Sequence, residues 1–284
     1  MTMLLLGLIG DNIAASRSPL LHRLAGAQNG IDVRYDRLVP PATGETFAAV
    51  FARAMAGGYR GVNVTYPYKE RVTALIGIDD PGVVAMGAVN TVIFGPEGPK
   101  GFNTDHSGFM AAYGRVQGAA PAGPVLMIGA GGVGRAVAFG LARLGCTDLR
   151  LVDRDAAKAL ALATALAPVA PALRVTLHED AGAAAQGAAG LVNCTPLGMV
   201  GYPGTPLPRA AMAGADWAFD AVYTPADTQF LTDAADAGLA IISGWELFFY
   251  QGVHAWGHFA GHLTDRPLDE DALRRDLLDP RAVP

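Results

Sequence analysis

Lys69 and Thr65 are the side chains of this 284-residue chain best suited to handle a proton and a hydroxyl group together. Both lie in the stretch GVNVTYPYK, residues 61–69, where valines alternate with polar residues as in a strand with one buried face. Pro67 has no N–H for a strand ladder, so the strand ends in a rigid turn. The turn presents both side chains at the carboxyl end of the strand, where ligands bind in open α/β sheets. A lysine there can exchange a proton with a small oxygenated molecule, and a plain surface lysine is the alternative.

A glycine-rich turn, GAGGVGR at residues 129–135, follows a buried strand at 125–128 and opens an alanine-rich helix. In this context Gly129 allows the tight turn, Gly131 lets the backbone approach a pyrophosphate, and Gly134 lets the helix pack on the strand. The motif therefore predicts a dinucleotide-binding site, whose nicotinamide would meet the lysine of the first stretch.

Asp153 ends the next predicted strand, about twenty residues past the glycines. A carboxylate there accepts hydrogen bonds from both adenine-ribose hydroxyls and repels a 2′-phosphate, which favours NAD. Arg154 could instead pair with a 2′-phosphate or stack on adenine, which keeps NADP as the alternative. The NAD prediction fails if initial rates at matched concentrations show a clear preference for NADP⁺.

Ser16 and Ser18 precede a predicted helix at residues 20–29. Ser18 has the residue type of an N-cap, and Pro19 suits the first helical position. A cap does not account for Ser16, and two hydroxyls beside a helix N-terminus also form a cradle for a carboxylate. The residues alone leave both interpretations open.

Asn90 and Asp105 lie near the ends of two strands that the turn at residues 95–98 joins into a hairpin. Polar side chains have little structural work to do at such positions, which makes these two candidates for contact with a substrate. A hairpin with polar ends is the alternative.

Strands and helices alternate along the chain, which predicts an α/β fold with parallel sheets. The first half has predicted strands at 4–9, 33–39, 61–65, 87–94 and 100–105, and helices at 20–29, 45–55 and 68–76. The second half has predicted helices at 106–117, 132–144 and 156–167. Its predicted strands lie at 125–128 and 149–153, and three further strands start at residues 191, 217 and 241. The glycine-rich turn makes this second half a Rossmann-type, doubly wound domain.

The composition excludes several other classes of protein. Hydrophobic residues make up 51% and charged residues 17%, so the chain has material for real cores. A net charge of -5 without a basic cluster argues against nucleic acid. Cys146 and Cys194 lie far apart and are expected as reduced thiols. No stretch of eighteen apolar residues occurs, so we expect a soluble, cytoplasmic protein without a membrane partner.

Three histidines, His254, His258 and His262, share one face of a predicted C-terminal helix at 246–262. No carboxylate motif accompanies them, and Gly257 and Gly261 loosen the helix, so we expect no metal. The sequence leaves the oligomeric state open, with a homodimer as one option.

Four motifs, SRSP, GVNVTYPYK, GAVNTV and GFNTD, resemble in order and spacing the substrate domain of the shikimate dehydrogenase family, including its quinate/shikimate branch. Further motifs downstream match as well, so the resemblance covers nearly the whole chain. It implies a substrate domain at residues 1–105, completed by C-terminal helices at 245–284. It also implies an NAD(P)-binding domain at 106–244, with a cleft between the two.

The resemblance also implies roles for individual residues. Lys69 and Asp105 match the catalytic pair of the family. The residues that match substrate contacts are Ser16 and Ser18 for the carboxylate, Thr65 and Asn90 for ring hydroxyls, and also Tyr223 and Gln251. The cofactor-binding set comprises Gly129, Ala130, Gly131, Gly132, Val133, Gly134, Asp153, Arg154, Thr195, Pro196, Leu197, Met199, Ala221 and Gly244.

These matches predict reversible oxidation of shikimate to 3-dehydroshikimate and of quinate to 3-dehydroquinate. Ser18 favours shikimate as the substrate, whereas Asp153 is typical of the NAD-dependent quinate/shikimate branch. We therefore expect oxidation of both shikimate and quinate. The alternatives are a dehydrogenase of another hydroaromatic acid, such as an aminoshikimate-type compound, and a non-catalytic ligand-binding relative. Which member of the Lys69–Asp105 pair acts as the base in oxidation stays open.

Overall fold

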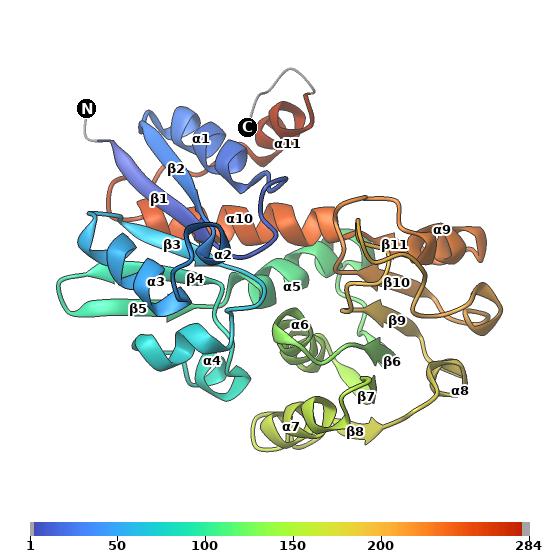
Figure 1. Cartoon of the computed structure of the whole chain (residues 1–284). Helices are drawn as coiled ribbons and strands as arrows, with labels where there is room; N and C mark the ends of the chain where they lie inside the picture. The colour runs from blue at the N-terminus through green and yellow to red at the C-terminus, as the bar shows by residue number, and fades with distance from the viewer. Residues whose placement is uncertain (1–2, 280–284) are drawn as a thin grey trace. The chain divides into compact units, whose positions relative to one another are not determined.

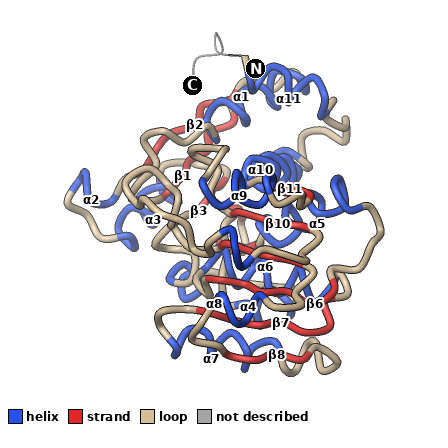
Figure 2. The backbone as a smooth tube through the Cα atoms, turned by 90° about the vertical axis from the view of Figure 1, so that its right-hand side faces the viewer, coloured by secondary structure: helices blue, strands red, loops and turns tan. Residues whose placement is uncertain are grey.

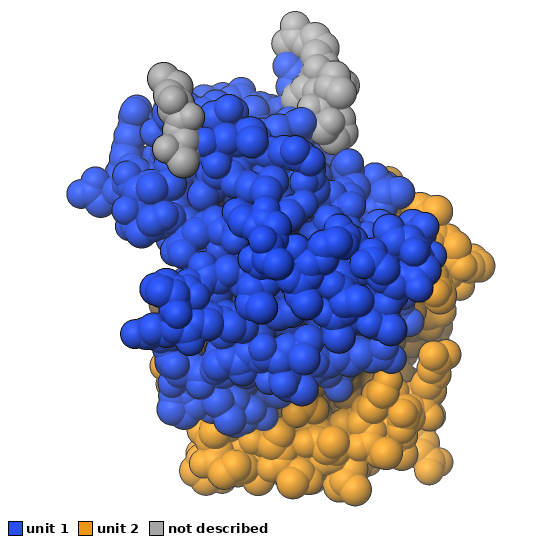
Figure 3. Space-filling view, turned by 60° about the vertical axis from the view of Figure 1, so that its left-hand side comes forward, with its two compact units in different colours: residues 1–104, 251–284 blue, residues 105–250 orange. Residues whose placement is uncertain are grey.

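The structure, a computed structural model, describes residues 3–279, which divide into two compact units. Within these residues, unit 1 comprises 3–104 and 251–279, and unit 2 comprises 105–250; Figure 3 colours unit 1 blue and unit 2 orange. The sequence predicts domain limits after residues 105 and 244, whereas the contacts change after Thr104 and Tyr250. The outer ends of the predicted first domain, 1–2 and 280–284, lie outside the described residues. Within 3–279, no helix is both long and apolar enough to cross a bilayer.

Unit 1 is built on a five-stranded mixed sheet with the strand order β2-β1-β3-β4-β5 (Figure 1). Its strands are β1 (Leu4–Ile9), β2 (Val33–Leu38), β3 (Gly61–Val64), β4 (Thr91–Gly95) and β5 (Gly98–Phe102). The first three strands are parallel, and β4 and β5 form the predicted antiparallel hairpin. Because β1 and β3 are parallel neighbours, the residues after Ile9 and Val64 emerge at the same edge of the sheet.

The helices of unit 1 pack around this sheet. They are α1 (Ser18–Asn29), α2 (Pro40–Thr43), α3 (Phe47–Ala56), η1 (Arg71–Leu75, a 3₁₀ turn), α4 (Pro81–Met86), α11 (Glu270–Leu278) and the second part of α10 (Gly244–Ala260). In α3, apolar side chains recur on one stripe, and the Thr46 hydroxyl accepts a hydrogen bond from the N–H of Ala49 at 3.2 Å. Helix α10 lies close against α1, since a Cβ at Gly252 would lie 2.5 Å from the Leu21 side chain.

Parts of unit 1 differ from the prediction. The helix predicted at 68–76 is only the 3₁₀ turn η1, because the chain around Lys69 is held in a turn by the bond from Val89 N to Lys69 O at 2.9 Å. The strand predicted from Gly87 begins at Thr91, because Gly87 has a φ of +64° and ends α4. The short helices α2 and α4 were not predicted, although each begins at a proline, a residue suited to the first helical turn.

Unit 2 is built on a fully parallel six-stranded sheet with the order β11-β10-β9-β6-β7-β8, and Figure 2 shows its strands stacked one above another. Its strands are β6 (Gly123–Ile128), β7 (Cys146–Val152), β8 (Arg174–Leu177), β9 (Gly190–Asn193), β10 (Trp217–Asp220) and β11 (Ala240–Ile242). The strand order reverses between β6 and β9. The loops after these two strands therefore flank the switch point, where dinucleotides bind in such sheets.

The helices of unit 2 follow the predicted alternation. They are α5 (Thr104–Gln117), α6 (Gly132–Arg143), α7 (Ala156–Leu166), α8 (Ala181–Ala185), η2 (Arg209–Ala211, a 3₁₀ turn), α9 (Gln229–Asp236) and the first part of α10. The sequence did not predict β8 and α8. Strand β8 has only four residues and none of them is fully buried, so the alternation in its sequence, RVTL, is too short to identify a strand.

Apolar packing in unit 1 explains why its two segments belong together. On β1, Leu6 packs with Trp256 and Phe259 of α10 in one buried cluster. On β3, Val62 packs with Phe51 of α3 in another. The C-terminal segment is therefore part of the core, and the predicted α/β fold class is confirmed.

Candidate active site

Ser16 and Ser18 lie buried at the start of α1. Ser16 Oγ donates a hydrogen bond to Ser18 Oγ at 3.2 Å and accepts one from the backbone N–H of Ser18 at 3.3 Å. The N–H groups of a helix N-terminus attract negative charge. Two hydroxyls that bond to each other can both turn toward an incoming carboxylate, so the pair suits an acidic ligand.

Arg17 is the N-cap of α1, and its side chain makes no capping hydrogen bond. Ser18 is the first helical residue, so the capping role considered for it is wrong. Arg17 Nη2 donates to the carbonyl of Leu277 at the end of α11, and Arg37 Nη2 donates to the carbonyl of Ser16 at 2.8 Å. The serine pair is thus held through main-chain contacts, and capping does not occupy its hydroxyls.

Thr65 and Lys69 follow β3 in a turn tied to the end of β1. Thr65 N donates to Ile9 O at 2.9 Å. A Cβ at Gly10 would lie 2.4 Å from Thr65 Cγ2, so this close approach requires glycine. Both side chains are partly exposed, which leaves them open to a ligand.

Tyr68 fixes the same turn through a contact that the sequence did not reveal. Its hydroxyl donates to Asp11 Oδ1 at 2.5 Å, and its ring stacks on Phe47 with centroids 4.5 Å apart. Burial, and secondarily this bond to Asp11, raises the pKa of Tyr68 to about 12. The phenol therefore stays a donor at neutral pH, and it anchors the residue before Lys69.

Asn90 lies just before β4 and is 3% exposed. Its Oδ1 accepts from Thr104 N at 2.7 Å and from the hydroxyls of Thr104 and Thr91 at 3.2 Å each. Its Nδ2 donates to Thr104 Oγ1 at 3.0 Å and to Gln251 Oε1 at 3.4 Å. The expectation that this polar side chain has little structural work is wrong. The long bond to Gln251 is the one that a ligand could replace at least cost.

A buried polar network continues from Asn90 into the sheet. Asn63 Nδ2 donates to Thr91 Oγ1 at 3.0 Å and to the Asn90 carbonyl at 3.3 Å. Tyr35 OH donates to Asn63 Oδ1 at 2.8 Å, and His22 stacks on the Tyr35 ring. Burial lowers the pKa of His22 to about 3, so this imidazole is neutral at physiological pH. These residues hold the side chain of Asn90 in one orientation.

Asp105 is the residue after Thr104, in the first turn of α5, and it is 5% exposed. A carboxylate in the first turn of a helix is favoured by the helix dipole. The hydrogen bonds of Thr104 therefore fix the backbone position from which Asp105 extends. The structure thus brings Asn90, Thr104 and Gln251 into one network and attaches Asp105 to it along the chain.

The three glycines of the turn after β6 differ in what a side chain would meet. Gly129 has a φ of +101°, and a Cβ there would lie 2.7 Å from the backbone of Cys194. A Cβ at Gly134 would lie 2.2 Å from Gly129 O, so helix α6 contacts the turn itself. A Cβ at Gly131 would meet nothing within 4 Å. Gly131, the N-cap of α6, faces open space, which suits the backbone approach of a pyrophosphate.

Asp153 links the end of β7 to the glycine turn. Its Oδ2 accepts from the N–H of Ala130 at 2.7 Å, and its Oδ1 accepts from the N–H of Asp155 at 2.8 Å. Each carboxylate oxygen keeps a second lone pair for a ribose hydroxyl. Arg154 is exposed, while Asp155 caps α7 by accepting from Ala157 N at 3.1 Å. The acidic residue after Arg154 is therefore explained by its capping of α7.

The loop after β9 carries Thr195 and is shaped by Asn193. Asn193 Oδ1 accepts from Thr195 N at 2.9 Å and from Thr195 Oγ1 at 2.7 Å, and Thr195 Oγ1 accepts from Leu197 N at 3.2 Å. Met199 N donates to Pro196 O at 3.0 Å, which closes a turn. Pro196 and Leu197 are exposed beside the switch point of the sheet.

Asp220 is a fully buried carboxylate at the end of β10 that the sequence analysis missed as a functional candidate. It accepts from Asn193 Nδ2 at 3.0 Å, from Val222 N at 2.9 Å and from Thr228 Oγ1 at 2.6 Å. Burial raises the pKa of Asp220 to about 6, although these hydrogen bonds act in the opposite direction. Through Asn193, this carboxylate sets the shape of the loop that carries Thr195.

Gly244 and Tyr223 lie near the end of β10 in unit 2. A Cβ at Gly244 would lie 2.4 Å from the carbonyl oxygen of Val222, so packing alone already requires glycine there. Tyr223 stacks on Phe248 of α10, with centroids 4.9 Å apart and 9° between the planes. Ala221 N donates to Asn193 O at 2.8 Å and is fixed to the neighbouring strand.

The three C-terminal histidines lie on α10 and just beyond it. The His258 ring stacks on Phe102 with centroids 3.9 Å apart, and burial lowers the pKa values of His254 and His258. In residues 3–279, no three histidine, cysteine or acidic side chains are grouped so as to hold a metal ion.

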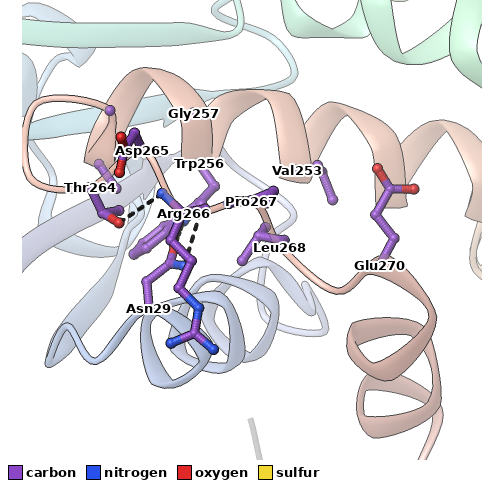
Figure 4. Close-up of a pocket in the computed structure, with 12 residues that line it drawn as sticks. Asn29, Val253, Trp256, Gly257, Thr264, Asp265, Arg266, Pro267, Leu268 and Glu270 are labelled. Atoms are coloured by element: carbon purple, nitrogen blue, oxygen red, sulfur yellow. Dashed lines mark hydrogen bonds between the residues drawn. The ribbon is translucent and has the colours of Figure 1, made fainter.

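A hollow of about 320 Å³ in unit 1 lies beside α10 and the connection to α11 (Figure 4). Trp256 Nε1 donates to Asn29 Oδ1 at 2.7 Å, and Asn29 Nδ2 donates to the Arg266 carbonyl at 3.2 Å. These bonds join α1, α10 and the connection to α11. None of the predicted site residues lines this hollow.

Comparisons with known proteins agree with this geometry. The family model described as "Shikimate dehydrogenase substrate binding domain" matches residues 8–92. The quinate/shikimate dehydrogenase (NAD(+)) of Corynebacterium efficiens is 36% identical over 269 residues, which cover 91% of this chain and 93% of that protein. The chain belongs to the shikimate dehydrogenase family.

Two further members of the family are similar over nearly the whole length. The shikimate dehydrogenase (NADP(+)) of Moorella thermoacetica is 40% identical over 283 residues, covering 96% of this chain and 93% of that protein. The quinate dehydrogenase from Corynebacterium glutamicum, solved in complex with NAD, has a TM-score of 0.85 at 32% identity and covers 96% of this chain and 98% of its own. The recognition of the family from its motifs is therefore confirmed.

Proposed function

We propose that the protein is a dehydrogenase that reversibly oxidises shikimate to 3-dehydroshikimate and quinate to 3-dehydroquinate with NAD. The observation that carries this proposal is the buried Ser16–Ser18 hydroxyl pair at a helix N-terminus, which suits a carboxylate and is not needed as a cap. Relatives with these activities in their names, at 36% and 40% identity, support it.

In this proposal, unit 1 is the substrate domain. Ser16 and Ser18 would hold the carboxylate, and Thr65, Asn90 and Gln251 would contact the rest of the substrate. Asn90 would donate from Nδ2 to a ring hydroxyl in place of its 3.4 Å bond to Gln251. Its Oδ1 is already engaged by Thr104 and Thr91. Gln251 would then turn its own amide to a neighbouring hydroxyl.

Unit 2 is the cofactor domain in this proposal. The turn at 129–134 would hold the pyrophosphate and Asp153 the adenine ribose, while Thr195, Pro196, Leu197, Met199, Ala221 and Gly244 would surround the nicotinamide end. The nicotinamide supplies the hydride chemistry when bound. The fit rests on the open space at Gly131 and on the orientation of the Asp153 carboxylate by Ala130 and Asp155.

NAD is the proposed cofactor because Asp153 places a negative charge where NADP carries its 2′-phosphate. Asp153→Asn keeps one acceptor oxygen for the backbone and removes the charge. This substitution should lower the preference for NAD⁺. The ratio of kcat/KM for NAD⁺ to kcat/KM for NADP⁺ should fall by about tenfold or more. An unchanged ratio would leave Arg154 as the residue that decides between the cofactors.

Lys69 and Asp105 are the proposed proton-transfer residues. Lys69 would relay the hydroxyl proton as the substrate is oxidised and would protonate the nascent alkoxide in reduction. Asp105 would orient the ammonium group of the lysine by accepting a hydrogen bond from it. The cytoplasmic location and the homodimer option stay predictions.

Steady-state kinetics with shikimate and quinate, each against NAD⁺ and NADP⁺, test the proposal. We expect turnover of both acids with NAD⁺, and a Lys69→Ala variant that loses turnover far more than substrate affinity. Absence of turnover with every combination would reject the activity. Near-normal turnover in Lys69→Ala would reject the role of Lys69 alone.

A further inference from the structure

Arg17 and Arg37 both donate hydrogen bonds next to the Ser16–Ser18 pair. Arg37 Nη2 donates to Ser16 O at 2.8 Å, and Arg17 Nη2 donates to Leu277 O. Both acceptors are main-chain carbonyls. Among residues 3–279, neither guanidinium has a carboxylate within ion-pair distance.

Two other arginines of unit 1, Arg34 and Arg53, form ion pairs. Arg34, on the same strand as Arg37, donates from Nε to Asp36 Oδ1 at 3.1 Å. Arg53 forms a two-bond pair with Glu45, at 2.8 and 3.2 Å. Unneutralised guanidinium groups therefore set the surroundings of the serine pair apart from these surface ion pairs.

The contact of Arg37 places its charge at the main chain of Ser16. Arg37 reaches from β2 to the carbonyl of Ser16, the residue whose hydroxyl bonds to that of Ser18. Ser18 itself is in the first turn of α1, where the helix dipole is positive. An anion between the two hydroxyls would meet two favourable fields that a neutral group would not.

We infer that Arg37, supported by Arg17, makes the Ser16–Ser18 pair selective for a carboxylate over a neutral group of the same shape. The inference rests on the proposed function and names a specificity determinant for it. Arg37 acts as a positioning residue: it fixes the backbone of Ser16, and its charge stabilises the bound anion through space. Lysine at this position would keep the charge and lose the planar guanidinium contact.

The test compares shikimate with its methyl ester in wild type, Arg37→Gln and Arg37→Lys. Binding to the full chain is measured by calorimetry, and kcat and KM are measured with saturating NAD⁺. We expect Arg37→Gln to weaken binding of shikimate about tenfold while binding of the ester and kcat change little. Arg37→Lys should restore most of the discrimination. Arg34→Gln is the matched control, because its charge is on the same strand but is paired with Asp36.

Two results would overturn the inference. If Arg37→Gln weakens binding of shikimate and the ester equally, the residue has a structural role without charge selection. If it changes neither, the charge does not reach the ligand. If wild type turns over shikimate and Arg37→Gln still prefers shikimate to the methyl ester as strongly as wild type does, this inference is rejected. The proposed function then stays intact. Wild type that neither binds nor oxidises shikimate would reject both.

Discussion

The side-chain oxygen of Asn90 accepts the backbone N–H of Thr104 at 2.7 Å, and this bond fixes the start of α5. The hydroxyl of Thr104 lies within 3.2 Å of Asn90 Nδ2, Asn90 Oδ1 and Thr91 Oγ1. An amide from the turn before β4 thus satisfies one of the N–H groups that a helix N-terminus leaves unpaired. The same amide is a proposed substrate contact, so substrate binding and the placement of Asp105 share one group.

Replacing Thr104 tests this arrangement. Thr104→Val keeps the shape but leaves Asn90 Nδ2 without its nearest acceptor. We expect a loss of about 1–3 kcal/mol in the free energy of unfolding, measured by urea denaturation, and a clear fall in kcat. Thr104→Ser keeps the hydroxyl and should stay near wild type in both. Equal behaviour of the two variants would contradict a role for the hydroxyl.

Tyr68→Phe removes the 2.5 Å hydrogen bond to Asp11 without changing the stacking on Phe47. Because the acceptor is a carboxylate, we expect a loss of about 1.5–3 kcal/mol in the free energy of unfolding. Looser placement of Lys69 should lower kcat more than it raises KM for shikimate. Tyr66→Phe is the control for stability, since Tyr66 is 71% exposed and should unfold like wild type.

Alanine at two glycines of the cofactor turn should have opposite effects. Gly134→Ala places a Cβ 2.2 Å from a backbone oxygen, so we expect about 1–3 kcal/mol or more of destabilisation. Gly131→Ala meets open space and a φ of -75°, so its stability should match wild type. Its NAD⁺ dissociation constant should nevertheless rise at least about tenfold, because the methyl group occupies the space for the pyrophosphate. Tight NAD⁺ binding by a folded Gly131→Ala would show that the pyrophosphate lies elsewhere.

Asp220 makes stability depend on pH. Its pKa is raised from 3.8 to about 6, so the folded protein holds this proton more tightly than the unfolded chain. The stabilisation is complete below pH 3.8 and is lost as the pH rises through about 6. Relative to Asp220→Asn, which does not titrate, the free energy of unfolding of wild type should fall by roughly 3 kcal/mol across this window. A difference between the two proteins that stays constant from pH 4 to about pH 7.5 would contradict the raised pKa.

The sequence predicted the elements whose local pattern is strong. The alternation at residues 61–65, the glycine turn before α6 and the position of Asp153 each depend on neighbours in sequence, so the residues alone revealed them. Short elements such as β8 and α8 were missed, because four or five residues carry too little periodic signal to identify a strand or a helix.

The supporting contacts of the site could not be predicted for a different reason. Asn90 bonds to Gln251, 161 residues away in sequence, and Arg17 bonds to Leu277, 260 residues away. Such contacts depend on which helix packs where. A local signal did exist at Thr104, a hydroxyl residue directly before an acidic one at the start of a helix.

The C-terminal segment of unit 1 has a consequence for how the protein is made. Trp256 and Phe259 belong to the same buried cluster as Leu6 and Ile93, so that cluster is incomplete until these two residues have left the ribosome. Unit 2 has its last strand by Ile242, and its sheet can therefore assemble during translation. Unit 1, whose first segment is synthesised before unit 2, is thus the unit that completes its core after unit 2 has its sheet.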